Sequence, residues 1–327
     1  HGPPVILAAA QRAVKSHPNT HFILCGDESL IKAAIEPLDA SEKQRITVEH
    51  CEQVVAMDEK PTSALRTKKQ SSMRRILELV ESGLADACVS AGNTGALMAM
   101  AFYVLKTLPG IDRPALVTAM PNASHHRVFL LDLGANVNCN SETLFQYGVM
   151  GTVLAQQCAK IDKPRVALLN VGEEDIKGNA QIKYADQLFR DASEINYIGY
   201  VEGDDIFTDV ADVVVTDGFT GNVALKSSEG LAKLVINEVK RMSQQNWYTQ
   251  LLAKIALPLL KSIYNRVNPD QYNGASLLGL RGIVVKSHGN ASADAFFYAI
   301  EQAINEAQMQ VPERIKTKIE QVLLEPH

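Results

Sequence analysis

Two polar turns in this chain combine residue types that suit the binding of an anion. The first turn follows an apolar run and contains Ser90, Gly92, Asn93, Thr94 and Gly95. The second follows another apolar run and contains Asp217, Gly218, Thr220, Gly221 and Asn222. A helical pattern follows each turn, so both are expected to present free backbone N–H groups and the positive end of a helix dipole. Together they predict a cleft that holds an oxyanionic group.

Two further polar residues add charge and acid–base chemistry. Lys177 lies in a polar loop, residues 172–178, and His288 lies in the string KSHG, residues 286–289. Each signal also has a plainer explanation. The polar turn residues are typical helix caps, Lys177 is equally well a solvated lysine, and His288 a surface histidine. Taken one at a time, these residues leave both explanations open.

The composition restricts the class of protein. The chain has 327 residues, is 46% hydrophobic and carries a formal net charge of −5, which argues against nucleic acid as a partner. Five cysteines without a CxxC pair indicate free thiols in a reducing cytoplasm. The sequence opens on His-Gly-Pro-Pro rather than Met, so we expect a native N-terminal segment to precede it.

Apolar runs alternate with amphipathic helical patterns along the chain. Strands are predicted over 21–25, 46–49, 87–90, 115–119, 128–132, 165–170, 197–201, 213–217 and 282–286. Helices are predicted over 5–15, 29–35, 71–82, 95–105, 143–159, 184–192, 224–241 and 294–308. This alternation predicts an α/β fold with a mostly parallel sheet covered on both faces. Ligands of such sheets bind beyond the carboxyl ends of the strands, where both turns lie.

The segment 247–266 departs from this alternation. It is apolar at helical spacing, but Lys254, Lys261 and Arg266 interrupt it and Pro258 must kink or break a helix. Two explanations stay open: a helix facing the core, or a protruding helical hairpin that contacts a partner or an anionic membrane surface. The segment is too short and too charged to span a bilayer.

Several catalytic signatures are missing from the sequence. It contains no GxGxxG after a strand, no GxxxxGK[ST], no HExxH, no GxSxG and no cluster of Cys and His. We therefore predict neither a metal nor an organic cofactor, and expect no nucleotide hydrolysis or serine-hydrolase chemistry.

Strings along nearly the whole chain closely resemble the bacterial phosphate acyltransferase family of phospholipid synthesis (PlsX). They are SSM (71–73), VSAGNTGALM (89–98), RPAL (113–116), LDLGAN (131–136), VALLNVGEE (166–174), KG (177–178), NYIG (196–199), DGFTGNV (217–223), NPDQYNGA (268–275), LLGLRG (277–282) and KSHG (286–289). Family members begin with an earlier strand that ends in Met-Gly-Gly-Asp, which this sequence lacks.

The resemblance implies a phosphorolysis in which acyl-[acyl carrier protein] and inorganic phosphate give acyl phosphate and free carrier protein. It also implies a three-layer α/β/α fold of the isocitrate/isopropylmalate dehydrogenase type, with a cleft between two lobes and a homodimer. Residues 1–113 with 283–327 would form one lobe and residues 114–282, including segment 247–266, the other. A cytoplasmic enzyme that contacts the membrane peripherally would pass acyl phosphate to a glycerol-3-phosphate acyltransferase.

Under this resemblance the candidate residues acquire roles. Asn93, Thr94 and the amides of Gly92 and Gly95 hold phosphate, and Lys177 supplies charge. Asn222 and the backbone of residues 218–221 stabilise the tetrahedral oxyanion. His288 protonates the departing thiolate or orients phosphate. Asp217 orients Lys177 or His288, and no covalent acyl-enzyme is needed.

Two other functions compete with this one. A phosphotransacetylase-like enzyme would use acyl-CoA, and a non-catalytic membrane scaffold would act through segment 247–266. A nicotinamide-dependent dehydrogenase is disfavoured because no paired-Asp metal site is evident. Since the carrier protein is acidic, a basic patch should meet it, and the candidates are Arg66, Lys68, Lys69, Arg74 and Arg75.

Overall fold

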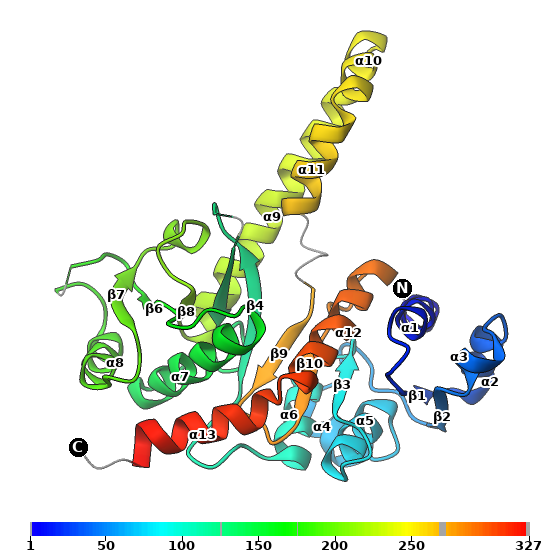
Figure 1. Cartoon of the computed structure of the whole chain (residues 1–327), viewed down its shortest axis with the longest axis horizontal. Helices are drawn as coiled ribbons and strands as arrows, with labels where there is room; N and C mark the ends of the chain where they lie inside the picture. The colour runs from blue at the N-terminus through cyan, green and yellow to red at the C-terminus, as the bar shows by residue number, and fades with distance from the viewer. Residues whose placement is uncertain (1, 125, 175, 268–272, 325–327) are drawn as a thin grey trace.

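A computed structural model describes residues 2–124, 126–174, 176–267 and 273–324, and its centre is a mixed β-sheet (Figure 1). In this part of the chain, eight strands pair in the order β3-β10-β9-β4-β5-β8-β6-β7, and β1 and β2 form a separate pair. The strands are β1 Phe22–Gly26, β2 Ile46–His50, β3 Ala87–Ser90, β4 Ala115–Pro121, β5 Arg127–Leu131, β6 Val166–Leu169, β7 Tyr197–Val201, β8 Val213–Val215, β9 Ala275–Leu278 and β10 Ile283–Lys286.

Helices cover both faces of this sheet, which confirms the predicted α/β class. They are α1 Pro3–Ser16, α2 Glu28–Ile35, α3 Ala40–Lys43, α4 Pro61–Thr67, α5 Ser72–Glu81, α6 Thr94–Leu105, α7 Ser141–Cys158, α8 Ala180–Asp191, α9 Gly218–Ser243, α10 Trp247–Ile255, α11 Leu257–Val267, α12 Ala293–Gln308 and α13 Val311–Leu324. A short 3-10 turn, Asp205–Phe207, precedes β8.

The middle of the sheet is antiparallel, a feature that the sequence did not predict. β3 and β10 pair in parallel, as do β5, β8, β6 and β7 in turn, but β9 pairs antiparallel with both β10 and β4, and β4 with β5. The strand β9 was missed because its four residues follow a loop-like polar stretch. β9 and β4 lie between the two parallel blocks, and their three antiparallel pairings make β3 and β10 run opposite to β5, β8, β6 and β7. The carboxyl ends of β3 and β10 therefore lie at the edge where β5, β8 and β6 begin.

Alternating side chains of the central strands build a core on each face of the sheet. On β5, Phe129 and Leu131 pack into the cluster that contains α7, whereas Val128 and Leu130 pack into the cluster that contains α6. The period of two is that of a strand buried on both sides, which explains the uninterrupted apolar runs. α7 is buried along most of its length and α13 packs against it.

The two ends of the chain meet other parts of the fold differently. α1 packs against α12, which also contacts β3 and β10. The last helix α13, absent from the predicted elements, instead contributes Val311, Ile315 and Ile319 to the core around α7 (Figure 1). The division into two lobes at residues 113 and 283 stays a prediction.

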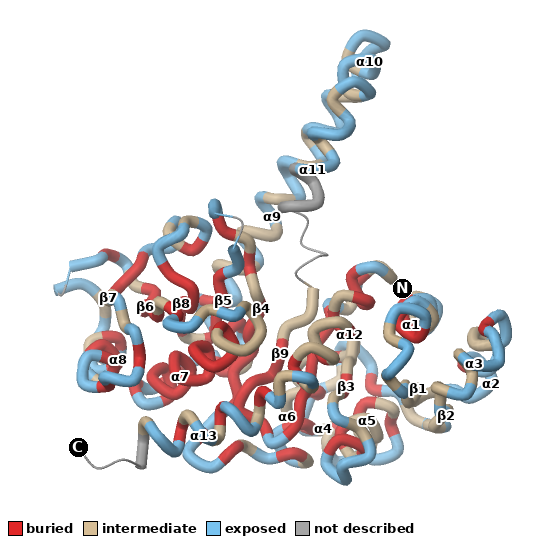
Figure 2. Tube along the Cα trace, in the orientation of Figure 1, coloured by how far each residue is buried: buried red, intermediate tan, exposed pale blue. Residues whose placement is uncertain are grey.

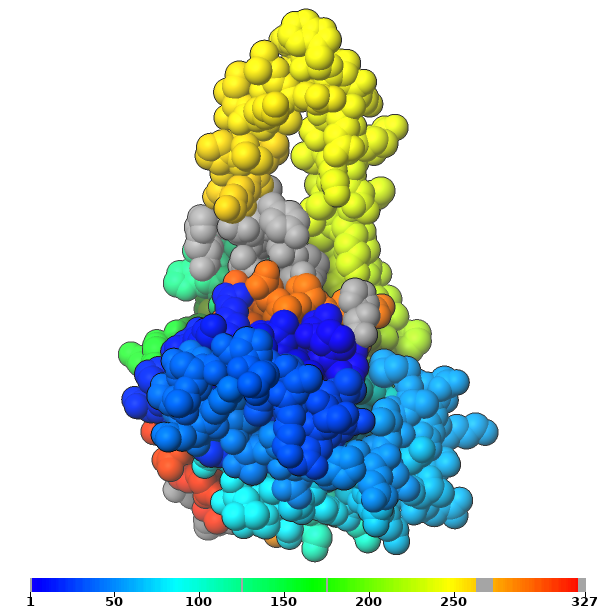
Figure 3. Space-filling model, turned by 90° about the vertical axis from the view of Figure 1, so that its right-hand side faces the viewer, coloured from blue at the N-terminus to red at the C-terminus, as the bar shows by residue number. Residues whose placement is uncertain are grey.

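Helices α9, α10 and α11 form a hairpin that stands out from the body (Figures 1 and 3). Segment 247–266 is therefore a protruding hairpin, and the alternative of a core-facing helix is wrong: α10 has no buried residue (Figure 2). The break predicted at Pro258 is confirmed, because α10 ends at Ile255 and α11 begins at Leu257, placing the proline in a first turn where its missing N–H costs nothing.

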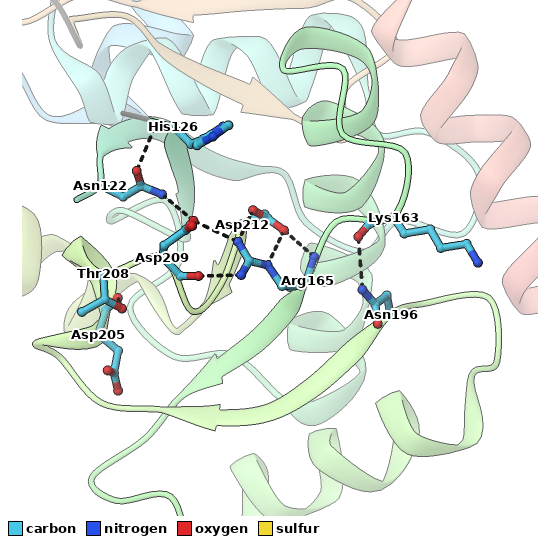
Figure 4. Close-up of polar contacts among 9 residues, drawn as sticks. All are labelled: Asn122, His126, Lys163, Arg165, Asn196, Asp205, Thr208, Asp209 and Asp212. Carbon is cyan, nitrogen blue, oxygen red and sulfur yellow. Dashed lines mark hydrogen bonds and ion pairs between the residues drawn. The ribbon is translucent and has the colours of Figure 1, made fainter. Parts of the chain in front are cut away.

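An ion-pair cluster fixes the edge of the sheet where β6 and β8 begin (Figure 4). Arg165 forms a fork with both carboxylate oxygens of Asp212, at 3.0 and 2.9 Å, and contacts Asp209 at 3.1 Å. Asn122 joins Asp209 to the turn at His126. β6 and β8 begin at this edge, and its contacts here are structural. β3 and β10 run in the opposite direction and end at the same edge, further along the strand order.

The buried carboxyl of Glu306 makes stability depend on pH. The Ser276 hydroxyl and the Gln302 amide donate to it, and burial raises its pKa from 4.5 to about 7. Between these values the folded chain holds a proton that the unfolded chain has lost, so stability falls as pH rises from about 4.5 to 7.

We predict that Glu306→Gln removes this pH dependence. Because glutamine stays neutral, the variant should exceed the wild type in unfolding free energy at pH 8 by up to ~3 kcal/mol and match it near pH 4.5. Urea unfolding across this range measures the effect, with exposed Glu320→Gln as the control that keeps the wild-type profile. Parallel curves for wild type and Glu306→Gln would contradict the assignment.

Candidate functional site

The second polar turn is held by a buried carboxylate. Asp132 follows β5 and accepts hydrogen bonds from the amides of Leu116 at 3.0 Å, Ala135 at 3.0 Å and Asn136 at 2.6 Å, and from the Asn136 side chain at 3.2 Å. Burial raises its pKa, and these donors oppose the rise by stabilising the charged form. Asp132 thereby fixes the loop 132–136 beside the start of α9.

Two glycines let α9 approach this loop closely. The amide of Gly218 donates to the Asn136 carbonyl at 2.8 Å. A Cβ on Gly218 would lie 2.5 Å from that carbonyl oxygen, and one on Gly221 would lie 1.9 Å from the Asp132 carbonyl oxygen. Gly218 and Gly221, predicted to bind substrate, are thus required by packing of backbone against backbone.

The cap of α9 occupies two more predicted residues. Asp217 accepts from the Thr220 amide at 2.8 Å and from the Thr220 hydroxyl at 3.0 Å, as an N-cap does. Asp217 is half-buried and Thr220 is exposed, and Asn222 is exposed further along the helix, with its side chain beside Gly134. Asp217 and Thr220 serve the helix, which leaves Asn222 as the polar side chain available to a ligand.

The first polar turn is also built by internal contacts. Asn93 caps α6 by accepting from the Ala96 amide at 3.0 Å, and its amide group donates to the carbonyls of Met57 and Glu59, both at 2.9 Å. The Gly92 amide donates to the Ser90 hydroxyl at 3.2 Å. Asn93 and Ser90 therefore shape the turn rather than extend from it.

Glycine is again required here by close packing. A Cβ on Gly92 would lie 2.4 Å from the end of Met73, and one on Gly95 would lie 2.8 Å from Pro61. The amides of Thr94 and Gly95, the first two residues of α6, precede any acceptor within the helix. These two N–H groups are the part of the turn that can meet an anion.

His288 is brought to the first turn by the pairing of β10 with β3. The Ser287 amide donates to the Ser90 carbonyl at 2.9 Å, and a Cβ on Gly289 would contact both Met57 and the Ala91 carbonyl. Asn273 holds the position by accepting from the His288 amide at 2.8 Å and donating to the Ser287 hydroxyl at 2.7 Å. The rest of the string 268–275, residues 268–272, lies outside the described ranges.

Lysines surround His288. The Lys226 ammonium, on α9, lies 3.5 Å from His288 Nε2 and 2.9 Å from the Glu229 carboxylate. Burial and the nearby Lys226 charge lower the pKa of His288, so its imidazole is neutral at pH 7. The same two causes lower the pKa of Lys286, at the end of β10, to about 8. This end of the site is electropositive.

Lys177 is not brought to these residues by any contact that the described ranges contain. Its amide donates to the Glu174 carbonyl, and its side-chain carbons pack beside Gly172 in the same loop. The structure thus groups Ser90–Gly95 with His288, and Asp217–Asn222 with Asp132, while α9 links the two groups through Lys226. Lys177 follows the neighbouring strand β6 and is exposed.

Some residues of the site escaped prediction. Asp132 and Asn136 lie in the matching string LDLGAN, and Lys286 in KSHG, but an isolated acid, amide or lysine gives no sign of its burial. Lys226 lies in a plain helical pattern. Among the described residues, no group of three or more His, Cys, Asp or Glu is placed to hold a metal ion, and no helix is both long and apolar enough to cross a bilayer.

Known proteins match this chain over almost its whole length. A family model described as "Fatty acid synthesis protein" matches residues 1–314. The chain is 58% identical over 325 residues to the phosphate acyltransferase of Pseudoalteromonas atlantica and 52% identical to that of Shewanella sp. strain MR-4, in each case over 99% of this chain and 95% of the relative.

Solved structures share the fold at low sequence identity. A phosphotransacetylase from Streptococcus pyogenes superposes with a TM-score of 0.62 and 17% identity, covering 92% of this chain and 91% of that one. A branched-chain phosphotransacylase from Enterococcus faecalis V583 gives 0.59 and 16% identity, covering 94% and 96%.

The close approach of α9 to loop 132–136 is testable with a pair of glycines on one helix. We predict that Gly221→Ala lowers the free energy of unfolding by about 1–3 kcal/mol, because its methyl group would overlap the Asp132 carbonyl. In Gly230→Ala the added methyl group has no neighbouring atom within 4 Å, so this substitution should instead raise the free energy of unfolding by about 0.5–1 kcal/mol. Urea unfolding compares the two, and equal effects would show that the approach is not close.

Proposed function

Because the chain belongs to the phosphate acyltransferase family, and is thus an enzyme that transfers an acyl group to phosphate for phospholipid synthesis, we propose that its active site lies along the start of α9. This helix begins at the carboxyl ends of β5 and β8 and reaches the carboxyl ends of β3 and β10, which lie at the opposite edge of the sheet. The observation that carries this proposal is the link that α9 makes: it starts on the Asp132 loop and reaches His288 with Lys226. The second polar turn, at one edge of the sheet, is thereby joined to the first polar turn and the electropositive surroundings of His288 at the other edge.

The reaction proposed for this site is a phosphorolysis of acyl-[acyl carrier protein]. An oxygen of HPO₄²⁻ attacks the thioester carbonyl, the C–S bond breaks, and the phosphate proton passes to the departing thiolate. Acyl phosphate and free carrier thiol result, with no net change of charge. Because phosphate is already anionic at neutral pH, the enzyme's main task is to position it.

We assign oxyanion stabilisation to Asn222, which is exposed beside Gly134, and to the backbone amide of Phe219. The neighbouring amides of Gly218, Thr220 and Gly221 already donate to Asn136 and Asp217. One such donor is typically worth ~3–4 kcal/mol to a tetrahedral intermediate. The neutral imidazole of His288 supports a role in orienting phosphate over one as a pre-protonated acid. Lys177 retains its proposed role in supplying charge.

Incubation of the protein with palmitoyl-[acyl carrier protein] and phosphate tests the function directly. We expect phosphate-dependent release of both free carrier thiol and acyl phosphate. Thiol release that does not require phosphate would mean a thioesterase. Turnover of palmitoyl-CoA but not of the carrier thioester would favour the phosphotransacetylase-like alternative, and no turnover of either would favour the scaffold.

The proposed roles of Lys177 and His288 are tested by alanine variants in the same assay. We expect Lys177→Ala and His288→Ala each to lower kcat/KM at least about a hundredfold, the usual contribution of one charge or hydrogen-bond donor positioned in an active site. Lys163→Ala serves as the control and should retain full activity, because Lys163 is exposed before β6, which four strands separate from β10 (Figure 4). A loss below about tenfold would remove the residue from the mechanism.

The proposed carrier-protein patch carries less free charge than its sequence suggests. Arg74 pairs with Glu78 at 2.7 Å, Arg75 with Glu49 at 2.9 Å, and Lys68 approaches Glu59 at 4.0 Å. Within the described ranges no ion pair engages Arg66 or Lys69. We therefore assign the attraction of the acidic carrier protein mainly to these two residues.

The hairpin supports two further proposals, a homodimer and peripheral contact with the membrane. Apolar residues are exposed along its whole length: Leu231, Leu234, Val235, Val239 and Met242 on α9, Trp247, Tyr248, Leu251, Leu252 and Ile255 on α10, and Leu257 and Leu259 on α11. We assign the α9 limb to a second copy of the chain. We assign the tip, where Lys254 adjoins the apolar residues, to an anionic lipid surface of the cytoplasmic leaflet.

Membrane contact would place the product near its consumer. A long-chain acyl phosphate is amphipathic, so release at the bilayer would deliver it to a membrane-bound glycerol-3-phosphate acyltransferase.

A charge placed at the hairpin tip tests the membrane proposal. We predict that Leu251→Glu weakens sedimentation with phosphatidylglycerol-containing vesicles at least tenfold, because it loses apolar burial of ~2 kcal/mol and adds repulsion. Gln250→Glu introduces the same charge on an exposed polar residue and should bind nearly as the wild type does. Sedimentation velocity should show the same oligomeric state for both variants; equal vesicle binding by both would reject the tip as the contact.

A further inference from the structure

Lys286 is a buried cation without a carboxylate partner in the described part of the chain. It is the last residue of β10 and only 7% exposed, and its ammonium donates to the Ser287 carbonyl. No ion pair engages it among the described residues, and the neighbouring charge that lowers its pKa is that of another lysine, Lys226. A buried lysine is almost always paired, so an unpaired one implies an anion that binds there.

The charges around Lys286 match a dianion. The positive charges of Lys226 and Lys233, on α9, lower the pKa of His288, and the negative charge of Glu229 raises it. Glu229 pairs with Lys226 at 2.9 Å. Because the pKa of Lys286 is about 8, its ammonium is mostly charged at pH 7. Three lysines and one carboxylate leave a surplus of two positive charges, with His288 neutral.

The geometry of the edge places this charge where a small anion can meet backbone donors. Lys286 pairs with Ser90 across the parallel strands β10 and β3, and the two strands are followed by the starts of α12 and α6. Along β10, Val284 packs on the face of the sheet that also receives Ala224 and Leu225 of α9, and Lys286 shares that face by the period of two. Lys286 and Lys226 therefore lie on the same side of the sheet.

We propose that Lys286 and Lys226, with the imidazole of His288, bind the attacking inorganic phosphate in the space bounded by Ser90, Thr94 and α9. This assignment rests on the proposed function and makes it more specific. A phosphate group also occurs as the phosphodiester of a carrier protein's prosthetic arm, but a diester has one negative charge. The surplus of two charges favours the dianion of free phosphate.

The two lysines would act by positioning the nucleophile before the acyl donor arrives. An ammonium contributes a point charge with three rotatable donors, and a buried one keeps its orientation because its stem is packed. The first amides of α6 add donors of the kind that bind phosphate at helix starts. Lys177, exposed in its own loop, then remains available to the thioester oxygen or the departing group.

Steady-state kinetics of Lys226→Gln and Lys286→Met test the assignment. We expect each variant to raise KM for phosphate at least tenfold while KM for palmitoyl-[acyl carrier protein] changes less than twofold. Lys240→Gln is the matched control, since Lys240 lies on the same helix about 21 Å beyond Lys226 and should leave both constants unchanged. A raised KM for the acyl donor with KM for phosphate unchanged would assign the lysines to the donor and overturn the proposal.

A binding measurement without the acyl donor separates this inference from the proposed function. Inorganic phosphate should raise the Tm of the wild type and of Lys240→Gln, compared with chloride at equal ionic strength, because it binds the folded state alone. The shift should vanish in Lys226→Gln, whose exposed side chain makes misfolding an implausible cause. Phosphate stabilisation that survives in both Lys226→Gln and Lys286→Met would overturn the inference even if turnover is observed, whereas its loss would support the inference even if turnover is absent.

Discussion

The arrangement of the site depends on one buried carboxylate and the loop that it holds. Asp132 accepts hydrogen bonds from three backbone amides and one side-chain amide. The loop that these bonds hold presents its carbonyl oxygens to the first turn of α9. Only a helix that begins with glycines at 218 and 221 approaches that closely. The position of α9 is therefore set by backbone contact, which is far less adjustable than a contact between flexible side chains.

Fixing the start of α9 has consequences along its whole length. A helix of 26 residues extends about 39 Å, so a small error in its direction would be magnified at its far end. Near its start α9 carries Asn222 and Lys226 towards the candidate site, and beyond the body it forms one limb of the exposed hairpin. A single rigid element thus joins the chemistry of the strand ends to the surface that we assign to a second copy and to the membrane.

The balance of charge differs between the two halves of one edge of the sheet, where β6 and β8 begin and β3 and β10 end. At the amino ends of β6 and β8, Arg165 pairs with Asp212 and Asp209, so the charges there are balanced. At the carboxyl ends of β3 and β10, Lys286 is buried with Lys226 nearby and no acid to pair with it in the described ranges. Stability alone would favour a neutral residue there, because burial of an unpaired ammonium is costly. The buried ammonium of Lys286 therefore supports the proposed binding of an anionic ligand there.

The sequence by itself determined the alternation of strands and helices, the two polar turns, the break at Pro258 and the family, because periodicity, glycine and proline act locally. Tertiary structure alone decided that β9 runs antiparallel between two parallel blocks, that segment 247–266 protrudes, and that α13 packs against α7. It also showed that Asn93 and Asp217 cap helices, that Thr220 donates to Asp217, and that Lys286 is buried with no ion pair among the described residues. Those outcomes depend on which segments meet in space, and burial and pairing are properties of neighbours that lie far apart along the chain.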